Sequence, residues 1–388
     1  MPVDPEDTRI CLAPDEEPRP GRPAPTSVPI VQTSLFAHAS FQELIDALAA
    51  EHRHTVYTRG RNPTVQAVER KIAFLERGEA CLCLGSGMGA ISAVLLGLLE
   101  AGDHVLFLNQ TYGPTLQLAG ELRRFGIEHD LLLDLDRESV ERALRPTTRL
   151  IWMESPGTML FRLLDVAALA DLARRRGITT CLDNSWSTPL FQKPLTRGID
   201  LVVHTCTKYL AGHGDLVAGA IVGSAECLER IFYRSFLLLG SVLAPFDAWL
   251  LLRGLRTLPV RMARHEADAL RVASHLAGHP AIRAVHHPAL SGDPGLAGEL
   301  SGFSGVFSFE LVRDGFESVR AVLDALAIPA LGVSWGGVES VVISPARADG
   351  PAAAEHQGIP PGLVRLSVGL EGAEALIADL DAALAVLG

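Results

Sequence analysis

Strand-like and helix-like segments alternate between residues 81 and 222, and this alternation constrains the fold more than any other feature of the chain. Short apolar runs such as His104–Leu108 and residues 150–154 are typical of buried strands. Segments with helical periodicity, such as residues 165–176, lie between them. This order predicts an α/β fold in which helices cover a mostly parallel sheet.

The segment 200–210 leads from a buried strand to a lysine, Lys208. Open α/β sheets bind their ligands in the crevice at the carboxyl ends of the strands. Burial there lowers the pKa of a lysine and leaves an amine that can form a Schiff base. The hydroxyls of Thr205 and Thr207 can hydrogen-bond an anionic group such as a phosphate. From this segment alone, the alternative that Lys208 only extends from a strand end toward solvent stays open.

A second apolar strand, residues 178–182, ends in a carboxylate, Asp183. Pyridoxal 5′-phosphate, held by a lysine, requires a carboxylate that keeps its pyridine nitrogen protonated, so that the ring can accept electrons. Asp183 and Lys208 are both expected at carboxyl ends of strands in one sheet. The pair therefore predicts a pyridoxal 5′-phosphate site.

The glycine-rich run 85–90 precedes a helix expected over residues 90–100. Backbone N–H groups at a helix N-terminus bind anions well. The run also loosely matches the G-x-G-x-x-A fingerprint of dinucleotide-binding proteins, which requires an acidic residue after the next strand. That strand is followed by Asn109 and Gln110. The run therefore predicts a phosphate site, and an NAD-dependent oxidoreductase remains as the alternative from a different class.

Two further residues are candidates for ligand contacts. Tyr112 follows the strand His104–Leu108, where its ring can stack on a cofactor or simply belong to the core. Arg365 lies within an apolar strand and needs an anionic partner. That partner is either a substrate carboxylate held in a bidentate pair or a carboxylate of the protein. The histidines match no metal-binding spacing, so no metal site is predicted.

The length of 388 residues suits one large domain and a smaller one. We expect an N-terminal arm and helix over 1–56, a cofactor-binding large domain over 57–255 and a small α/β domain over 256–388. Residues 1–29 are rich in proline and charge, which predicts an extended arm without a packed core.

Composition bears on partners and location. The formal net charge of -11 gives no support to nucleic-acid or anionic-membrane binding. The six cysteines include no C-x-x-C pair, which predicts reduced thiols in a cytoplasmic protein. The longest apolar stretch, residues 236–252, contains Gly240, Pro245 and Asp247, which favours a buried helix–loop–helix over a membrane span.

From about Tyr57 to its C-terminus the chain resembles the Cys/Met-metabolism pyridoxal-phosphate enzymes of fold type I. The matching segments are Tyr-Thr-Arg-Gly-Arg-Asn-Pro-Thr (57–64), Ser-Gly-Met (86–88), Glu-Ser-Pro (154–156), Asp-Asn-Ser (183–185), Thr-Lys-Tyr-Leu-Ala-Gly-His (207–213), Leu-Leu-Arg-Gly-Leu-Arg-Thr-Leu (251–258) and Arg-Leu-Ser-Val-Gly-Leu-Glu (365–371). The resemblance implies the fold of these enzymes, with a large domain around a mostly parallel sheet and a smaller C-terminal α/β domain.

The resemblance also implies roles for individual residues. Lys208 would hold the cofactor and carry protons, Asp183 would pair with the pyridinium nitrogen, and Tyr112 would stack on the ring. The phosphate would be bound by Gly87, Met88, Thr205 and Thr207, together with Tyr57 and Arg59 of a neighbouring subunit. An amino-acid substrate would contact Ser334, Trp335 and Arg365. Members of the family share active sites across a dimer, and two dimers usually form a homotetramer.

Within the family, several residues favour one subclass. The segments 334–337 and 112–114 resemble bacterial cystathionine β-lyases. Val333 stands where the cystathionine γ-enzymes have glutamate and resembles methionine γ-lyase, but Pro114 departs from the cysteine of methionine γ-lyases. We therefore expect a carbon–sulfur β-lyase that releases a thiol, pyruvate and ammonia from a thioether amino acid. A γ-lyase or γ-replacement enzyme of the same family is the alternative.

Overall fold

The seven-stranded sheet at the centre of the molecule has the order β1-β7-β6-β5-β4-β2-β3. The computed structural model describes residues 3–14, 24–291, 298–348 and 357–388. Strand β7 is antiparallel to both of its neighbours, and the other pairs are parallel, so the prediction of a mostly parallel sheet is confirmed. The strands are β1 (Ala80–Leu84), β2 (His104–Leu108), β3 (Glu128–Leu132), β4 (Thr148–Glu154), β5 (Thr179–Asp183), β6 (Leu201–His204) and β7 (Gly219–Gly223).

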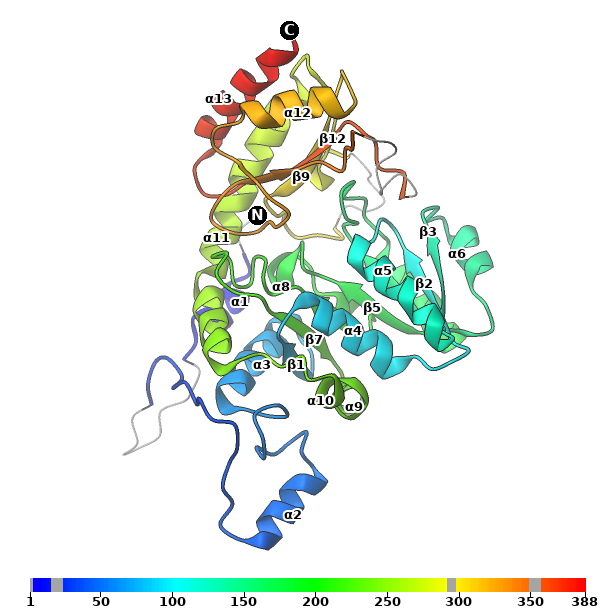
Figure 1. Ribbon diagram of the computed structural model, residues 1–388, viewed down its shortest axis with the longest axis vertical. Helices are drawn as coiled ribbons and strands as arrows, with labels where there is room; N and C mark the ends of the chain where they lie inside the picture. Colours follow the sequence, from blue (N-terminus) through cyan, green and yellow to red (C-terminus); the bar gives the residue numbers. More distant parts are fainter. Residues whose placement is uncertain (1–2, 15–23, 292–297, 349–356) are drawn as a thin grey trace.

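Helices cover both faces of this sheet (Figure 1). Successive side chains of a strand point to opposite faces. In β1, Cys81 and Cys83 accordingly join one core while Leu82 and Leu84 join the other. Helices α3 and α7 belong to the first core and α4, α5 and α9 to the second. The helices of this region are α3 (Pro63–Glu76), α4 (Gly87–Leu98), α5 (Gly113–Leu122), α6 (Arg137–Ala143), α7 (Val166–Arg176), α8 (Thr188–Phe191), α9 (Ala225–Ile231) and α10 (Leu237–Leu239).

Helix α11 (Pro245–Ala277) connects this region to a second sheet (Figure 1). The sequence predicts a long helical region over roughly 245–277, and the bounds of α11 agree with it. The second sheet has the order β10-β11-β12-β9-β8. The predicted domain boundary at 255/256 falls inside α11, and the division into domains stays a prediction. The elements are β8 (Ile282–His286), β9 (Val306–Leu311), α12 (Phe316–Ala325), β10 (Ala330–Leu331), β11 (Val341–Ile343), β12 (Leu363–Ser367) and α13 (Ala373–Leu384).

The N-terminal segment corrects one expectation. Residues 1–29 were expected to form an extended arm, but α1 (Pro5–Leu12) is a helix whose Asp7 and Cys11 are buried. Asp7 can be buried because its carboxylate pairs with Arg77 at 3.0 Å and with Lys193 at 2.8 Å. Residues 15–23 of the expected arm lie outside the described residues.

Two local expectations also differ from the structure. Helix α4 begins at Gly87, three residues before the expected start, because the Ser86 side chain caps it by accepting a hydrogen bond from Gly89 N. The stretch 236–252 is not wholly buried, since Leu238 is 73% exposed and Phe246 is 53% exposed. Among the described residues, no helix is both long and apolar enough to cross a membrane.

Candidate active site

A pocket of about 260 Å³ lies at the carboxyl ends of β4, β5 and β6. Parallel strands end at the same edge of a sheet, which brings together side chains that are far apart in the sequence. Nine of the twelve site residues predicted from the sequence line this pocket: Gly87, Met88, Tyr112, Asp183, Thr205, Thr207, Lys208, Trp335 and Arg365.

Lys208 is partly buried within the pocket. Its Nζ donates a hydrogen bond of 2.7 Å to Ser334 Oγ and lies 5.3 Å from the centre of the Trp335 ring. Ser334, another predicted residue, thus contacts the lysine directly. Burial and the nearby charge of Arg365 lower the pKa of Lys208 to about 8 from its ordinary value of 10.5, although Asp183 acts in the opposite direction. The neutral form of this amine is therefore still the minority near pH 7 but far more populated than in an ordinary lysine.

Asp183 is held in place by a short chain of hydrogen bonds. Its Oδ1 accepts hydrogen bonds from the Ser185 backbone N–H at 3.0 Å and from Ser185 Oγ at 2.5 Å. Ser185 Oγ in turn accepts a hydrogen bond from the Thr205 backbone N–H at 2.6 Å. Burial raises the pKa of Asp183, while these hydrogen bonds and the charges of His204 and Lys208 lower it. A cationic ring nitrogen beside this carboxylate would stabilise its charged form.

The first turn of α4 forms another wall of the pocket. A Cβ atom on Gly87 would lie 2.2 Å from Thr205 Oγ1, so only glycine allows the helix to approach this strand end so closely. Ser86, Gly87 and Met88 of this turn line the pocket together with Thr205, and backbone N–H groups at a helix N-terminus bind anions well. Thr207 Oγ1 hydrogen-bonds the Ala218 backbone, accepting from its N–H at 3.0 Å and donating to its carbonyl at 3.2 Å.

Arg365 has no acidic partner among the described residues. Its Nη2 donates to the carbonyl oxygens of Val333 at 3.0 Å and Ser334 at 3.3 Å. Burial lowers the pKa of Arg365 to about 10, well above neutrality, so the guanidinium keeps its charge. The sequence left a protein carboxylate open as its partner, and the described chain supplies none. A ligand carboxylate therefore suits this position.

Glu154 is a pocket residue to which sequence reasoning gave no role. It is the last residue of β4 and pairs in register with Asp183 of β5. Its Oε1 accepts a hydrogen bond of 2.7 Å from the Tyr112 backbone N–H, which holds the backbone at the start of α5. Burial and the charge of Asp183 raise the pKa of Glu154 well above its ordinary value. Its position at the end of a buried strand, like that of Asp183, is the signal in the sequence that could have identified Glu154 as a site residue.

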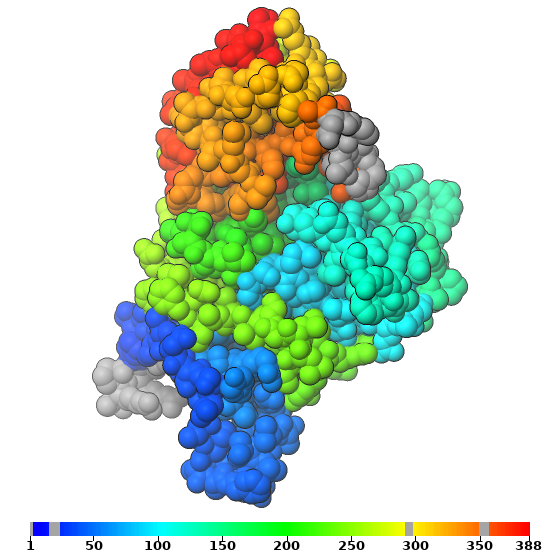
Figure 2. All heavy atoms as spheres, viewed as in Figure 1, coloured from blue at the N-terminus to red at the C-terminus, as the bar shows by residue number. Residues whose placement is uncertain are grey.

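Tyr57 and Arg59 do not line the pocket of their own chain. Both lie on the segment after α2 (Phe41–Ala49), which projects from the body of the molecule (Figures 1 and 2). The Arg59 guanidinium lies 5.5 Å from the centre of the Tyr57 ring, and Tyr57 is partly exposed. Their predicted role across a subunit interface stays a prediction.

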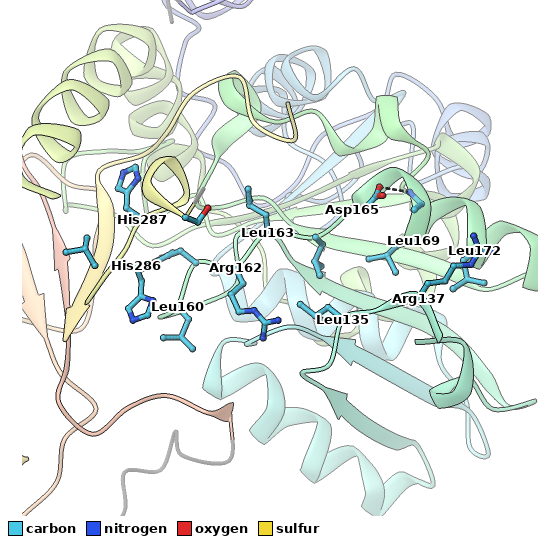
Figure 3. A pocket seen from close by; sticks show the side chains of 15 residues that line it. Leu135, Arg137, Leu160, Arg162, Leu163, Asp165, Leu169, Leu172, His286 and His287 are labelled. Atoms are coloured by element: carbon cyan, nitrogen blue, oxygen red, sulfur yellow. Dashed lines mark hydrogen bonds between the residues drawn. The ribbon is translucent and has the colours of Figure 1, made fainter. Parts of the chain in front are cut away.

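A larger cavity, of about 820 Å³, lies between α7 and β8 (Figure 3). Leucine side chains such as Leu135, Leu160 and Leu169 surround it. Its lining includes no lysine and no residue of the predicted site, and it shares only Phe161 with the smaller pocket. The chemical groups that a pyridoxal-phosphate site needs are in the smaller pocket.

Comparisons with known proteins bear on the family to which the chain is similar. The family described as Cys/Met metabolism PLP-dependent enzyme matches residues 11–385. The chain is 39% identical to L-methionine γ-lyase of Fusobacterium nucleatum, over 92% of each chain. It is also 39% identical to cystathionine β-lyase MetC of Bacillus subtilis, over 92% of this chain and 91% of that one. A Campylobacter jejuni protein described as an O-acetylhomoserine (thiol)-lyase, solved with N′-pyridoxyl-lysine-5′-monophosphate, superposes with a TM-score of 0.90 at 28% identity, over 98% of this chain and 99% of that one.

Proposed function

The chain belongs to the Cys/Met metabolism PLP-dependent enzymes, and on that premise we propose that it is a carbon–sulfur β-lyase acting on cystathionine or a similar thioether amino acid. The family and its fold, the use of pyridoxal 5′-phosphate and membership of the lyases follow from the comparisons. The choice of β-elimination and the roles of individual residues are the proposal.

The pocket residues fit the cofactor. Lys208 would hold it through its amine, and Asp183 would face its ring nitrogen with a carboxylate already oriented by Ser185. The first turn of α4, at Gly87, and the Thr205 hydroxyl would hold the phosphate. The close approach of these two elements leaves a cradle that any side chain at Gly87 would fill.

The chain's own groups can then perform an elimination. When bound, pyridoxal 5′-phosphate supplies an acceptor for the electron pair of the substrate's Cα–H bond. Arg365 would bind the α-carboxylate and thereby orient the Cα–H bond toward Lys208. Lys208, whose lowered pKa suits a general base, would accept the Cα proton. Expulsion of the thiolate from Cβ and addition of water complete the balance: cystathionine and water give homocysteine, pyruvate and ammonia.

Val333 is the observation that carries the choice of β-elimination. It lines the pocket, is 80% exposed and has no group that can transfer a proton. Loss of sulfur from Cγ would need a further deprotonation at Cβ, whereas loss from Cβ follows directly from removal of the Cα proton. An apolar residue at this position is compatible with β-elimination, which needs fewer proton transfers. It cannot assist the extra proton transfer that γ-elimination needs.

The γ-elimination alternative also has support, because the chain is as similar to an L-methionine γ-lyase as to a cystathionine β-lyase, at 39% identity in each case. Product identity separates the two. With L-cystathionine we expect pyruvate and homocysteine, and 2-oxobutanoate with cysteine as the main products would overturn the proposal. Val333→Glu should raise the share of 2-oxobutanoate, while Val333→Gln, of similar size but without an ionisable group, should not.

We further propose a dimer of dimers with shared active sites. Phe41, Ile45 and Leu48 lie on one side of the projecting helix α2 and are exposed, with Phe41 at 78%. Leu238 and Leu239 add a second exposed apolar group. A second copy of the chain would bury such surfaces and place its own Tyr57 and Arg59 at this pocket.

We also propose a cytoplasmic location. All six cysteines are free thiols, and five of them are buried. Reduced thiols are typical of the cytoplasm.

A further inference from the structure

A buried carboxylate, Glu76, lies behind the active-site edge of the large sheet. It is the last residue of α3 and is fully buried. A single oxygen, Oε1, accepts hydrogen bonds from Asn184 Nδ2 at 2.7 Å and from His204 Nε2 at 2.6 Å. Removing this carboxylate is costly, because it leaves the buried His204 donor without its acceptor. Asn184 Nδ2 would keep only its longer contacts, with the carbonyl oxygens of Gln192 at 3.1 Å and Thr188 at 3.4 Å.

The two donors occupy special places in the sheet. Asn184 directly follows Asp183 at the end of β5, and His204 directly precedes Thr205 at the end of β6. Asp183 and Thr205 line the cofactor pocket, whereas Asn184 and His204 do not. Because successive side chains of a strand point to opposite sides, Glu76 reaches the two strand ends from the side away from the pocket.

On the pocket side, the same two strand ends are joined through Ser185, which links Asp183 to the Thr205 backbone. The carboxyl ends of β5 and β6 are thus fastened on both sides, by Ser185 in front and by Glu76 behind. The segment that carries Lys208 begins at the end of β6. A shift of one strand end against the other would change the spacing between Asp183 and Lys208.

We propose that Glu76 is a positioning residue for the cofactor: it clamps the carboxyl ends of β5 and β6 from behind the sheet and so sets the spacing of Asp183, Thr205 and Lys208 in the pocket. Such a clamp matters because the side chains of a functional site keep their geometry only when other residues support them rigidly. The inference rests on the cofactor site of the proposed function but is independent of the choice between β- and γ-elimination.

Glu76 is itself held firmly. Lys193 Nζ donates a hydrogen bond of 2.9 Å to the carbonyl oxygen of the preceding residue, Leu75, and also pairs with Asp7 at 2.8 Å. Asn184 Nδ2 makes a further contact of 3.1 Å with the Gln192 carbonyl. The end of α3 is therefore fixed to the loop that follows β5, and the clamp has little freedom to move.

The chain offers a matched control at the opposite end of the same two strands. Asp200 precedes β6, and its Oδ2 accepts hydrogen bonds from Thr180 N at 2.8 Å and Thr180 Oγ1 at 2.7 Å on β5. It joins β5 to β6 as Glu76 does, but far from the cofactor end of the strands. Asp200→Leu should lower the melting temperature without weakening cofactor binding.

The test is cofactor retention by purified holoenzyme, followed by its visible absorbance during dialysis, together with the melting temperature. Glu76→Leu should raise the dissociation constant of pyridoxal 5′-phosphate by about tenfold or more, the size of effect that loss of supporting contacts has at metal sites. Glu76→Gln keeps an oxygen that can accept from both donors and should stay within about threefold of wild type. This readout does not depend on which products the enzyme forms.

Two results would overturn the proposal. One is a folded Glu76→Leu enzyme that retains the cofactor as tightly as wild type. The other is an equal loss of cofactor from Asp200→Leu, which would show that general strand pairing is responsible. Should Glu76→Leu not fold, Asn184→Ala removes one of the two donors, and unchanged cofactor affinity in that variant would equally contradict the clamp.

Discussion

At the scale of single residues, the chemistry of the site depends on the lowered pKa of the partly buried Lys208. Burial and the guanidinium of Arg365 both disfavour a charged amine, and together they outweigh the attraction of Asp183. The same carboxylate is drawn toward its neutral form by burial and toward its charged form by Ser185. The three groups therefore depend on one another, and the cofactor enters a site that is already polarised.

With the cofactor removed, Lys208 should react with an amine-directed acylating reagent with a midpoint at pH of about 8, well below that of an ordinary lysine at 10.5. The rate should rise with pH because only the neutral amine is nucleophilic. Arg365→Met removes a neighbouring positive charge and should move this midpoint upward. Mass spectrometry of the Lys208 peptide measures both, and a wild-type midpoint near 10.5 would contradict the burial argument.

The same pKa has a consequence for stability. Between about pH 8 and 10.5 the unfolded chain binds a proton at Lys208 that the folded apoprotein does not. The contribution of this residue to stability therefore improves as pH rises through that window and is least favourable below it.

At the scale of elements, the first turn of α4 and the end of β6 would determine the position of the phosphate in the proposed site. Their approach depends on the absence of a side chain at Gly87, where a Cβ would lie 2.2 Å from Thr205 Oγ1. The sequence indicated an anion site here but placed the helix start at Ala90. The earlier start at Gly87 follows from the Ser86 cap and brings backbone N–H groups of the glycine turn into the helix terminus.

Gly87→Ala should destabilise the protein by about 1–3 kcal/mol, because the methyl group forces α4 away from Thr205. It should also weaken cofactor binding, since the phosphate cradle opens. Thermal unfolding of the apoprotein and a cofactor titration measure the two effects. The control is Gly120→Ala in α5, where a Cβ meets no atom within 4 Å, so stability should rise by about 0.5–1 kcal/mol with unchanged cofactor affinity.

At the scale of the whole molecule, three of the twelve predicted site residues do not line the pocket of their own chain. Ser334 still contacts Lys208, but no hydrogen bond among the described residues links the other two to the pocket. Tyr57 and Arg59 follow the projecting helix α2, whose exposed apolar residues suit burial against another copy (Figure 2). Active sites shared between subunits, as proposed, would explain why helix α2 packs so little against the rest of its own chain.

Mixing two inactive variants tests this sharing. Arg59→Ala and Lys208→Ala subunits should each show little or no activity alone, because one lacks a phosphate contact and the other lacks the amine. After subunit exchange, some hybrid sites would combine intact residues from both chains, and part of the activity should return. Complete exchange, verified by native mass spectrometry, with no recovered activity would count against shared sites.

The sequence alone determined what depends on short-range patterns. Apolar runs and helical periodicity placed the strands of the large sheet, and the helix Pro245–Ala277 agrees at both ends. Because parallel strands end at one edge, the positions of Asp183 and Lys208 after two such strands were enough to predict their meeting in one pocket. The family resemblance added Ser334, which lies between β10 and β11, whereas Arg365 was already indicated by its place in an apolar strand, β12.

Only the tertiary structure decided which remote side chains meet behind and around that pocket. Glu76 lies 108 residues from Asn184 and 128 from His204, and no local pattern links them. Their contact depends on the packing of α3 against the sheet and on the pairing of β5 with β6. Likewise, α1 is ordered because Asp7 finds Arg77 and Lys193. Composition predicts how much apolar surface a segment can bury, but the partner that makes a buried charge tolerable is supplied only by the folded chain.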